Sequence, residues 1–326
     1  MLNGPQIHPL SIVELLIASA RLYRDNILSF VLITALVLVP YNLLTFLLAN
    51  PAAPIPNDGS TLGMITGFLR STSRPNSSGW PSWIYGLAID PLLSGTLILI
   101  AVQCYQQQTV TIGANFRRAR QRWLTLIFAN ILQGLIFILA ALPLIVVAIC
   151  GVSAITDLRV NAILAGGSPS SGTIDTIPAI LFILVGALFL ALPLIVQVRM
   201  AFTTQAVLLE EQGAAASIDR SWKLTQRMWP IIGFGVAIWL LELCLTRLPV
   251  GAVVYGMARA GADAQLVMAL QVALATIAQI VILPFTIIAY TLMFFDLLVR
   301  DEGFDLHQTL LTPPPDDGEY QPALST

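Results

Sequence analysis

Side chains that could carry hydrolytic or metal chemistry are few and scattered in this sequence. Such chemistry needs clustered histidine, cysteine or carboxylate groups. The two histidines, His8 and His307, lie near opposite ends, and neither has a ligand-type residue four positions later. The three cysteines, Cys104, Cys150 and Cys244, lie in separate apolar runs, and no HExxH, Walker or GxSxG pattern occurs. We therefore expect no enzyme activity, no catalytic residue, no metal and no cofactor.

The carboxylate of Glu242 lies near the middle of a long apolar run. A charge at that depth in a membrane is costly and usually faces the interior of a helix bundle. Two interpretations remain open. One is a proton or ligand site, with Arg247 or the glutamines Gln133, Gln197 and Gln279 nearby. The other is a protonated or hydrogen-bonded packing contact, which the lack of a second mid-span carboxylate favours.

The segment 218–229 places basic and apolar residues on opposite faces of a predicted helix. At about 100° per residue, one face holds Ile218, Trp222, Thr225 and Trp229. The other face holds Arg220, Lys223 and Arg227. A long apolar run follows directly, so the segment is typical of an amphipathic helix on a membrane surface that leads into a spanning helix.

Two earlier segments repeat this arrangement. In SIVELLIASARLYRDN, Ser11 and Glu14 have the spacing of a capping box. In IGANFRRARQRW, one face holds Ile112, Phe116, Ala119 and Trp123, and the basic residues are Arg117, Arg118, Arg120 and Arg122. The chain is therefore predicted to form three helical hairpins, each preceded by a short interfacial helix that we call an elbow.

Composition assigns the chain to the membrane class. Of its 326 residues 56% are hydrophobic and only 10% are charged, against about 25% charged residues in soluble domains. The mean hydropathy is +0.81. The formal net charge of −2 is not that of a nucleic-acid-binding protein, which needs a basic face.

Six stretches reach the roughly 20 apolar residues that a spanning helix needs. They are predicted at about 27–48, 91–109, 124–152, 177–198, 231–254 and 266–292. Asp90 is predicted to cap the second span ahead of Pro91. The connections at 49–83 and 153–175 are rich in Pro, Gly, Ser and Asn and are predicted to be irregular. Residues 1–306 form the predicted membrane domain, and 307–326 a disordered acidic Pro-rich tail.

Basic residues set the expected orientation, because cytoplasmic segments are enriched in Lys and Arg. With the N-terminus inside, eleven of the 16 basic residues fall on the cytoplasmic side. The other five are Arg70, Arg74, Arg159, Arg247 and Arg259. The expected localisation is the cell membrane, multi-pass, with both termini and all three elbows cytoplasmic.

Two segments resemble a known family. VLLEEQGAAASIDRSWKLTQRMWPIIGF (207–234) and FFDLLVRDEGFDL (294–306) are similar to hallmark segments of the membrane domain attached to some glycerophosphoryl diester phosphodiesterases. That domain also occurs as stand-alone proteins of unassigned function. The matching positions are Glu210, Arg220, Ser221, Trp222, Leu224, Thr225, Asp296, Arg300, Glu302, Gly303, Phe304 and Asp305. This sequence contains no phosphodiesterase barrel, so the resemblance implies a six-helix membrane protein without the hydrolase activity.

The predicted fold class is an all-α integral membrane protein with six spans and three cytoplasmic elbows. The leading functional hypothesis is a non-enzymatic module that engages membrane lipid or a membrane protein partner. Its expected surface is Arg117, Arg118, Arg120, Arg122, Arg220, Lys223 and Arg227. The alternatives are a transporter or permease subunit with a midplane cavity near Glu242, and a structural subunit of a larger complex. No nucleic-acid partner is expected, and the oligomeric state stays open.

Overall fold

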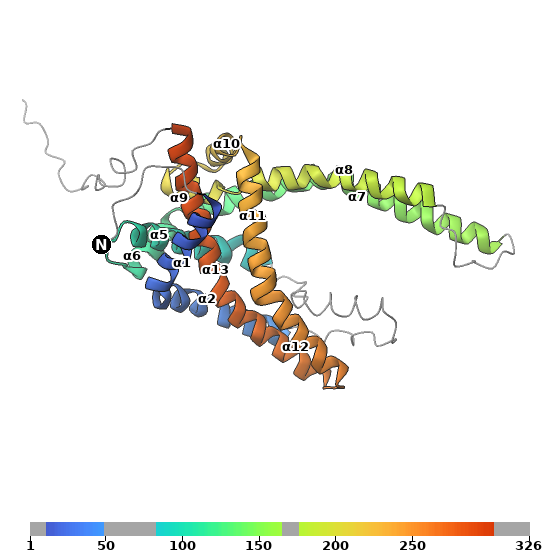
Figure 1. Cartoon of the computed structure of the whole chain (residues 1–326), viewed down its shortest axis with the longest axis horizontal. Helices are drawn as coiled ribbons and strands as arrows, with labels where there is room; N and C mark the ends of the chain where they lie inside the picture. The colour runs from blue at the N-terminus through green and yellow to red at the C-terminus, as the bar shows by residue number, and fades with distance from the viewer. Residues whose placement is uncertain (1–10, 49–82, 165–175, 303–326) are drawn as a thin grey trace, which may run out of the picture. The chain divides into compact units, whose positions relative to one another are not determined.

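The computed structural model describes residues 11–48, 83–164 and 176–302, and every regular element in them is a helix (Figure 1). Six helical stretches of these residues are long and apolar enough to cross a membrane, which confirms the predicted fold class. They are Ile27–Leu48, Tyr85–Tyr105, Trp123–Val147, Phe189–Leu209, Met228–Arg259 and Gln265–Arg300. The predicted tail, Gly303, Phe304 and Asp305 lie outside the described residues.

The chain forms two compact units. The first contains Met1–Asn76, Thr96–Phe116 and Glu242–Thr326, and the second contains Ser77–Gly95 and Arg117–Leu241. The helices α5 (Asp90–Tyr105), α6 (Ile112–Gln121) and α11 (Met228–Glu242) each continue from one unit into the other.

In the first unit, the long helix α13 (Ala264–Glu302) is the common packing partner. The helices α1 (Ile12–Asp25), α2 (Ile27–Leu48) and α12 (Leu248–Arg259) all contact it. The Tyr23 ring lies with its centroid 6.1 Å from that of Phe30 and 6.5 Å from that of Phe285. These aromatic pairs join α1 and α2 to α13, within the 4.5–7 Å range that aromatic contacts favour.

In the second unit, α7 (Trp123–Leu164) and α8 (Thr176–Arg199) pack along one another as a long hairpin (Figure 1). The shorter helices α9 (Thr203–Leu209) and α10 (Ala214–Leu224) pack on one another and on α7. The backbone of α7 is helical as far as Leu164. The prediction of an irregular connection from residue 153 was therefore wrong, because the helix continues through a stretch whose composition suggested a loop.

The second span begins before its predicted cap. A π-helical turn, η1 (Tyr85–Ile89), runs directly into α5, so Asp90 lies inside a continuous helix and the prediction that it caps the span was wrong. Pro91 has no N–H to donate to the preceding turn. Side chains of α7 bond carbonyls of that turn: Trp123 Nε1 donates to Ala88 O and Asn130 Nδ2 to Gly86 O, both at 2.8 Å.

All three predicted elbows are helical in the structure, as α1, α6 and α10. The capping box of α1 is formed: Ser11 N–H donates to Glu14 Oε2 at 2.7 Å, and Glu14 N–H donates to Ser11 Oγ at 3.3 Å. A single residue, Arg122, separates α6 from α7.

The third elbow differs from its prediction in its bounds and its buried face. It begins after the N-cap Gly213 and ends at Leu224, and α11 begins only at Met228. Since the helix is interrupted at residues 225–227, Trp229 does not extend the face of Ile218, and its side chain is 84% exposed. The buried residues of α10 are Ser217, Ile218, Ser221 and Leu224.

Candidate functional site

The candidate site lies in the second unit, where α10 folds back on the turn that follows α8. Ser221 Oγ donates to the Arg199 carbonyl at 2.7 Å and accepts from the Phe202 N–H at 3.2 Å. Thr225 Oγ1 donates to Ser221 O at 2.7 Å and lies 3.3 Å from the Arg199 carbonyl. Both side chains are fully buried. These two motif residues therefore bind the end of α8 to α10 and are unavailable to a ligand.

The Trp222 ring covers a basic side chain that the sequence did not single out. The Arg199 guanidinium carbon lies 5.5 Å from the Trp222 ring centroid, within cation–π range. Arg199 Nη1 also donates to the Trp222 carbonyl at 3.2 Å. Trp222 is 40% exposed, so this ring shields Arg199 while keeping a free edge. Nothing in the residue spacing relates these two positions.

An ion pair fixes the loop of residues 210–213, which joins α9 to α10. Arg220 Nε lies 2.9 Å from both carboxylate oxygens of Glu210. Gln212 Nε2 donates to Glu210 Oε2 at 2.8 Å. The two charged side chains are only about one-fifth exposed, at 22% and 20%. The motif residues Glu210 and Arg220 thus serve to hold this loop.

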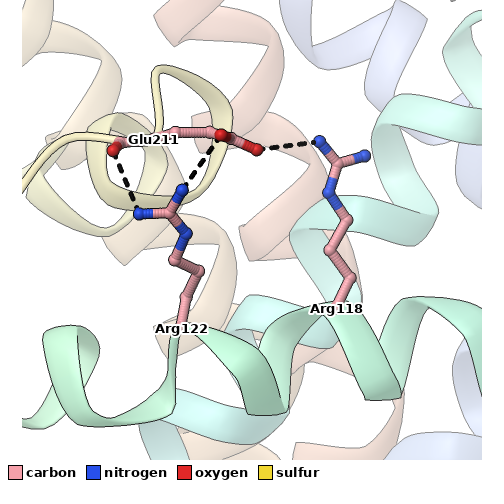
Figure 2. A network of polar contacts seen from close by, with 3 residues as sticks. All are labelled: Arg118, Arg122 and Glu211. Carbon is pink, nitrogen blue, oxygen red and sulfur yellow. Dashed lines mark hydrogen bonds and ion pairs between the residues drawn. The ribbon is translucent and has the colours of Figure 1, made fainter. Parts of the chain in front are cut away.

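The next carboxylate, that of Glu211, is held by arginines about ninety positions earlier in the chain (Figure 2). Arg122 Nη2 lies 2.9 Å from Glu211 Oε2, and Arg122 Nη1 donates to the Glu211 carbonyl at 3.1 Å. Arg118 Nη2 lies 3.4 Å from Glu211 Oε1. Glu211 has a φ of 54°, in the left-handed region that non-glycine residues rarely adopt. The role of Glu211 is not predictable from the sequence, because a pairing over this separation leaves no periodic signal.

The remaining predicted surface residues divide into paired and unpaired groups. Lys223 Nζ lies 2.6 Å from Asp219 Oδ2 in an exposed i, i+4 pair. Arg117, Arg120 and Arg227 are exposed, and among the described residues no side chain pairs with them. Of the seven basic residues predicted as one surface, four therefore pair with the three carboxylates of Glu210, Glu211 and Asp219, and three have no partner among the described residues.

Glu242 and Arg247 lie in the first unit and form an ion pair inside a span. Arg247 Nη2 lies 3.1 Å from Glu242 Oε1, and Thr246 Oγ1 donates to the Glu242 carbonyl at 2.6 Å. In an α-helix, residues five apart lie about 140° apart around the axis. The π-helical turn η2 (Leu243–Arg247) reduces that offset, because its i→i+5 hydrogen bonding winds the backbone less per residue. Arg247, which the sequence analysis named as a possible partner, is the partner.

The motif pair near the end of α13 is also formed. Arg300 Nε donates to Asp296 Oδ2 at 2.6 Å. The Asp296 side chain is 3% exposed and that of Arg300 is 32% exposed. Since Asp296 is buried, its carboxylate depends on bonded partners to remain inside the fold.

Comparison with known proteins places the whole membrane region in one family. The family described as "Domain of unknown function (DUF7847)" matches residues 10–298. The chain belongs to this family. The matched range contains α6, α10, the 210–213 loop and the Glu242–Arg247 pair. The family description carries no link to the phosphodiesterase-associated domain that the motif segments resemble. No curated protein and no solved structure matches the chain.

Proposed function

We propose that this protein is a non-enzymatic membrane module that binds anionic lipid headgroups through the basic residues of α6 and the α10–α11 turn. The observation that carries the proposal is the set of three exposed arginines, Arg117, Arg120 and Arg227, whose charge no described side chain offsets. On the expected orientation these residues face the cytoplasmic leaflet. Each basic group near an anionic surface contributes about 1 kcal/mol of attraction.

Aromatic exposure next to these charges supports the same interpretation. Trp229 is 84% exposed at the start of α11, and Trp222 is 40% exposed on α10. Tryptophan rings are enriched at the depth of lipid headgroups, because they combine an apolar body with one polar N–H. An exposed tryptophan two positions after Arg227 therefore suits a segment that lies in the headgroup layer.

The test measures lipid preference directly. The full chain is reconstituted in bilayers that contain brominated phosphatidylglycerol or brominated phosphatidylcholine, and quenching of tryptophan fluorescence gives the relative affinity for the two. We expect the wild type to prefer phosphatidylglycerol. The triple variant Arg117→Gln, Arg120→Gln, Arg227→Gln should lose most of this preference.

A matched control separates the site from overall charge. The control is the triple variant Arg70→Gln, Arg74→Gln, Arg159→Gln. It removes the same amount of charge from the expected outer side, and it should leave the preference for phosphatidylglycerol unchanged. Equal behaviour of the two triple variants, or no preference in the wild type, would refute the lipid-binding proposal.

One observation favours a second candidate function, a transporter or permease subunit. The Glu242–Arg247 pair lies at a π-helical turn inside a span, and such turns and intramembrane charges are frequent at functional sites. Uptake of labelled solutes by proteoliposomes that is lost in Glu242→Gln would support this candidate. The third hypothesis, a structural subunit, predicts a stoichiometric protein partner that co-purifies in mild detergent.

A further inference from the structure

Two adjacent glutamates of the 210–213 loop are held in different ways. Glu210 is about one-fifth exposed and is bonded by Arg220 and Gln212. Glu211 is 55% exposed, and its arginine partners are 56% exposed at Arg118 and 36% exposed at Arg122. Glu210 is therefore built into the loop, whereas the groups around Glu211 are accessible from outside the protein.

The arrangement around Glu211 is that of an occupied anion site. The two carboxylate oxygens are shared between two guanidinium groups, one at 2.9 Å and the other at 3.4 Å (Figure 2). Arginine forks match the geometry of carboxylate and phosphoryl oxygens alike. Arg118 lies in the last turn of α6, and Arg122 directly follows the last residue of that helix, so both guanidinium groups reach the Glu211 carboxylate.

The backbone of Glu211 has an uncommon conformation while its side chain contacts the two arginines. Its φ of 54° lies in the left-handed region, which costs a side-chain-bearing residue free energy. The contacts to Arg118 and Arg122, including the bond from Arg122 to the Glu211 carbonyl, compensate for that conformation. A ligand that takes over the arginines would release the loop to a more favourable backbone conformation.

From this geometry we infer that Arg118 and Arg122 form a binding site for a phosphomonoester group, which Glu211 occupies intramolecularly until such a ligand displaces it. The inference rests on the proposed function and deepens it by naming the headgroup class. A phosphomonoester carries between one and two negative charges near neutral pH, with a second pKa of about 6. It therefore competes well with a singly charged carboxylate, whereas a phosphodiester, with one charge, has no such advantage.

The experiment measures binding of three probes to the purified full chain in a neutral maltoside by titration calorimetry. The probes are a short-chain phosphatidic acid, the phosphatidylglycerol of the same chain length, and inorganic phosphate. Glu211→Gln should bind the phosphomonoester probe about tenfold more tightly than the wild type, as expected when a competing charge-assisted contact is removed. Arg118→Gln with Arg122→Gln should abolish this binding.

The two sources of the phosphomonoester are separated by the probes. Tighter binding of phosphatidic acid than of inorganic phosphate assigns the site to a lipid headgroup, and the reverse order assigns it to a soluble phosphate compound. Wild-type affinity for phosphatidic acid should rise as pH increases through about 6, because the second ionisation of the phosphomonoester strengthens the ligand against Glu211.

Two further variants keep the result interpretable. Asp219→Asn removes the same charge from an exposed pair on the neighbouring helix and should leave affinity unchanged. Glu211→Gly removes the carboxylate while suiting the left-handed backbone, and it replaces Glu211→Gln if that variant fails to fold.

Equal affinities for the Glu211 and Asp219 variants, or weaker binding by the Glu211 variants, would overturn the inference. The preference for phosphatidylglycerol is tested at Arg117, Arg120 and Arg227, and the phosphomonoester affinity at Arg118, Arg122 and Glu211, so the two proposals fail separately.

Discussion

Arg220 lies with its Nε atom 2.9 Å from both carboxylate oxygens of Glu210, across the loop that joins α9 to α10. Both residues belong to the motif segment, and neither is free to act as a lipid-binding charge. The pair is shielded, with side chains 22% and 20% exposed. The basic residues of the segment 218–229 therefore include one that holds the loop, Arg220, and one that is exposed in the turn after α10, Arg227.

Arg220→Gln should lower the free energy of unfolding by about 1–2 kcal/mol, because it removes a charge-assisted bond to a half-buried carboxylate. Titration with a denaturing detergent in mixed micelles measures this change. Lys223→Gln, which breaks the exposed pair with Asp219, should cost less than about 0.5 kcal/mol. Equal losses in the two variants would contradict the role given to Arg220.

Ser221→Ala should destabilise the protein by about 1–3 kcal/mol, because the buried hydroxyl bonds the Arg199 carbonyl and the Phe202 N–H together. Ser217→Ala is the matched control. Ser217 is equally buried in the same helix, but among the described residues its hydroxyl bonds only the Gly213 carbonyl of its own turn. The same unfolding titration should show a clearly smaller loss for Ser217→Ala, and a loss as large as that of Ser221→Ala would argue against a linking role for Ser221.

The elements that form because of neighbouring residues in the chain could be predicted from the sequence. Six spans follow from runs of about 20 apolar residues, and the elbow α1 was predictable from its capping box. Helix bounds were less predictable. The Thr225 hydroxyl bonds the Ser221 carbonyl at the point where α10 ends, a competition between side chain and backbone that periodicity does not show. The π-helical turn that places Asp90 inside its helix has no periodic signature either.

The candidate site was predictable only in part. Charge clustering predicted Arg118, Arg122 and Arg220 as one basic surface, but not that carboxylates of the protein pair with them. Glu211 meets Arg118 and Arg122 across 93 and 89 positions. Such contacts depend on how α7, α9 and α10 pack together, and a single sequence contains no record of that packing. The Glu242–Arg247 pair could be predicted from the sequence because both residues lie on one helical stretch.

Tyr23→Phe should keep or slightly raise stability near neutral pH. The Tyr23 hydroxyl is buried without a hydrogen-bond partner among the described residues, and the ring contacts to Phe30 and Phe285 survive the change. Burial raises the pKa of Tyr23 above its ordinary value of 10.0. Above about pH 10 the unfolded chain loses this proton while the folded protein keeps it, so stability falls as pH rises.

Thermal unfolding at a series of pH values checks this sign. The wild type should lose more stability above about pH 10 than Tyr23→Phe does. Tyr23→Ala, which removes the ring as well, should be destabilised at every pH. A steeper alkaline loss in the Phe variant than in the wild type would show that the Tyr23 hydroxyl has a stabilising partner.

Glu242→Gln and Arg247→Gln should each destabilise the protein more than the double variant does. Each single change leaves one charge, 37% exposed for Arg247 or 27% exposed for Glu242, without its partner inside a span. The double variant removes both charges and keeps polar side chains at both positions. We expect an interaction energy of about 1–3 kcal/mol in a double-mutant cycle measured by unfolding in mixed micelles.

The same cycle separates a structural pair from a transport site. If the pair only neutralises charge at the π-helical turn, the double variant recovers both stability and any function that the single variants lose. A double variant that recovers stability but not solute uptake would mean that Glu242 itself handles the solute or its proton. Additive losses, with no interaction energy, would instead show that the 3.1 Å contact between Arg247 and Glu242 contributes nothing, and the π-helical turn would need another cause.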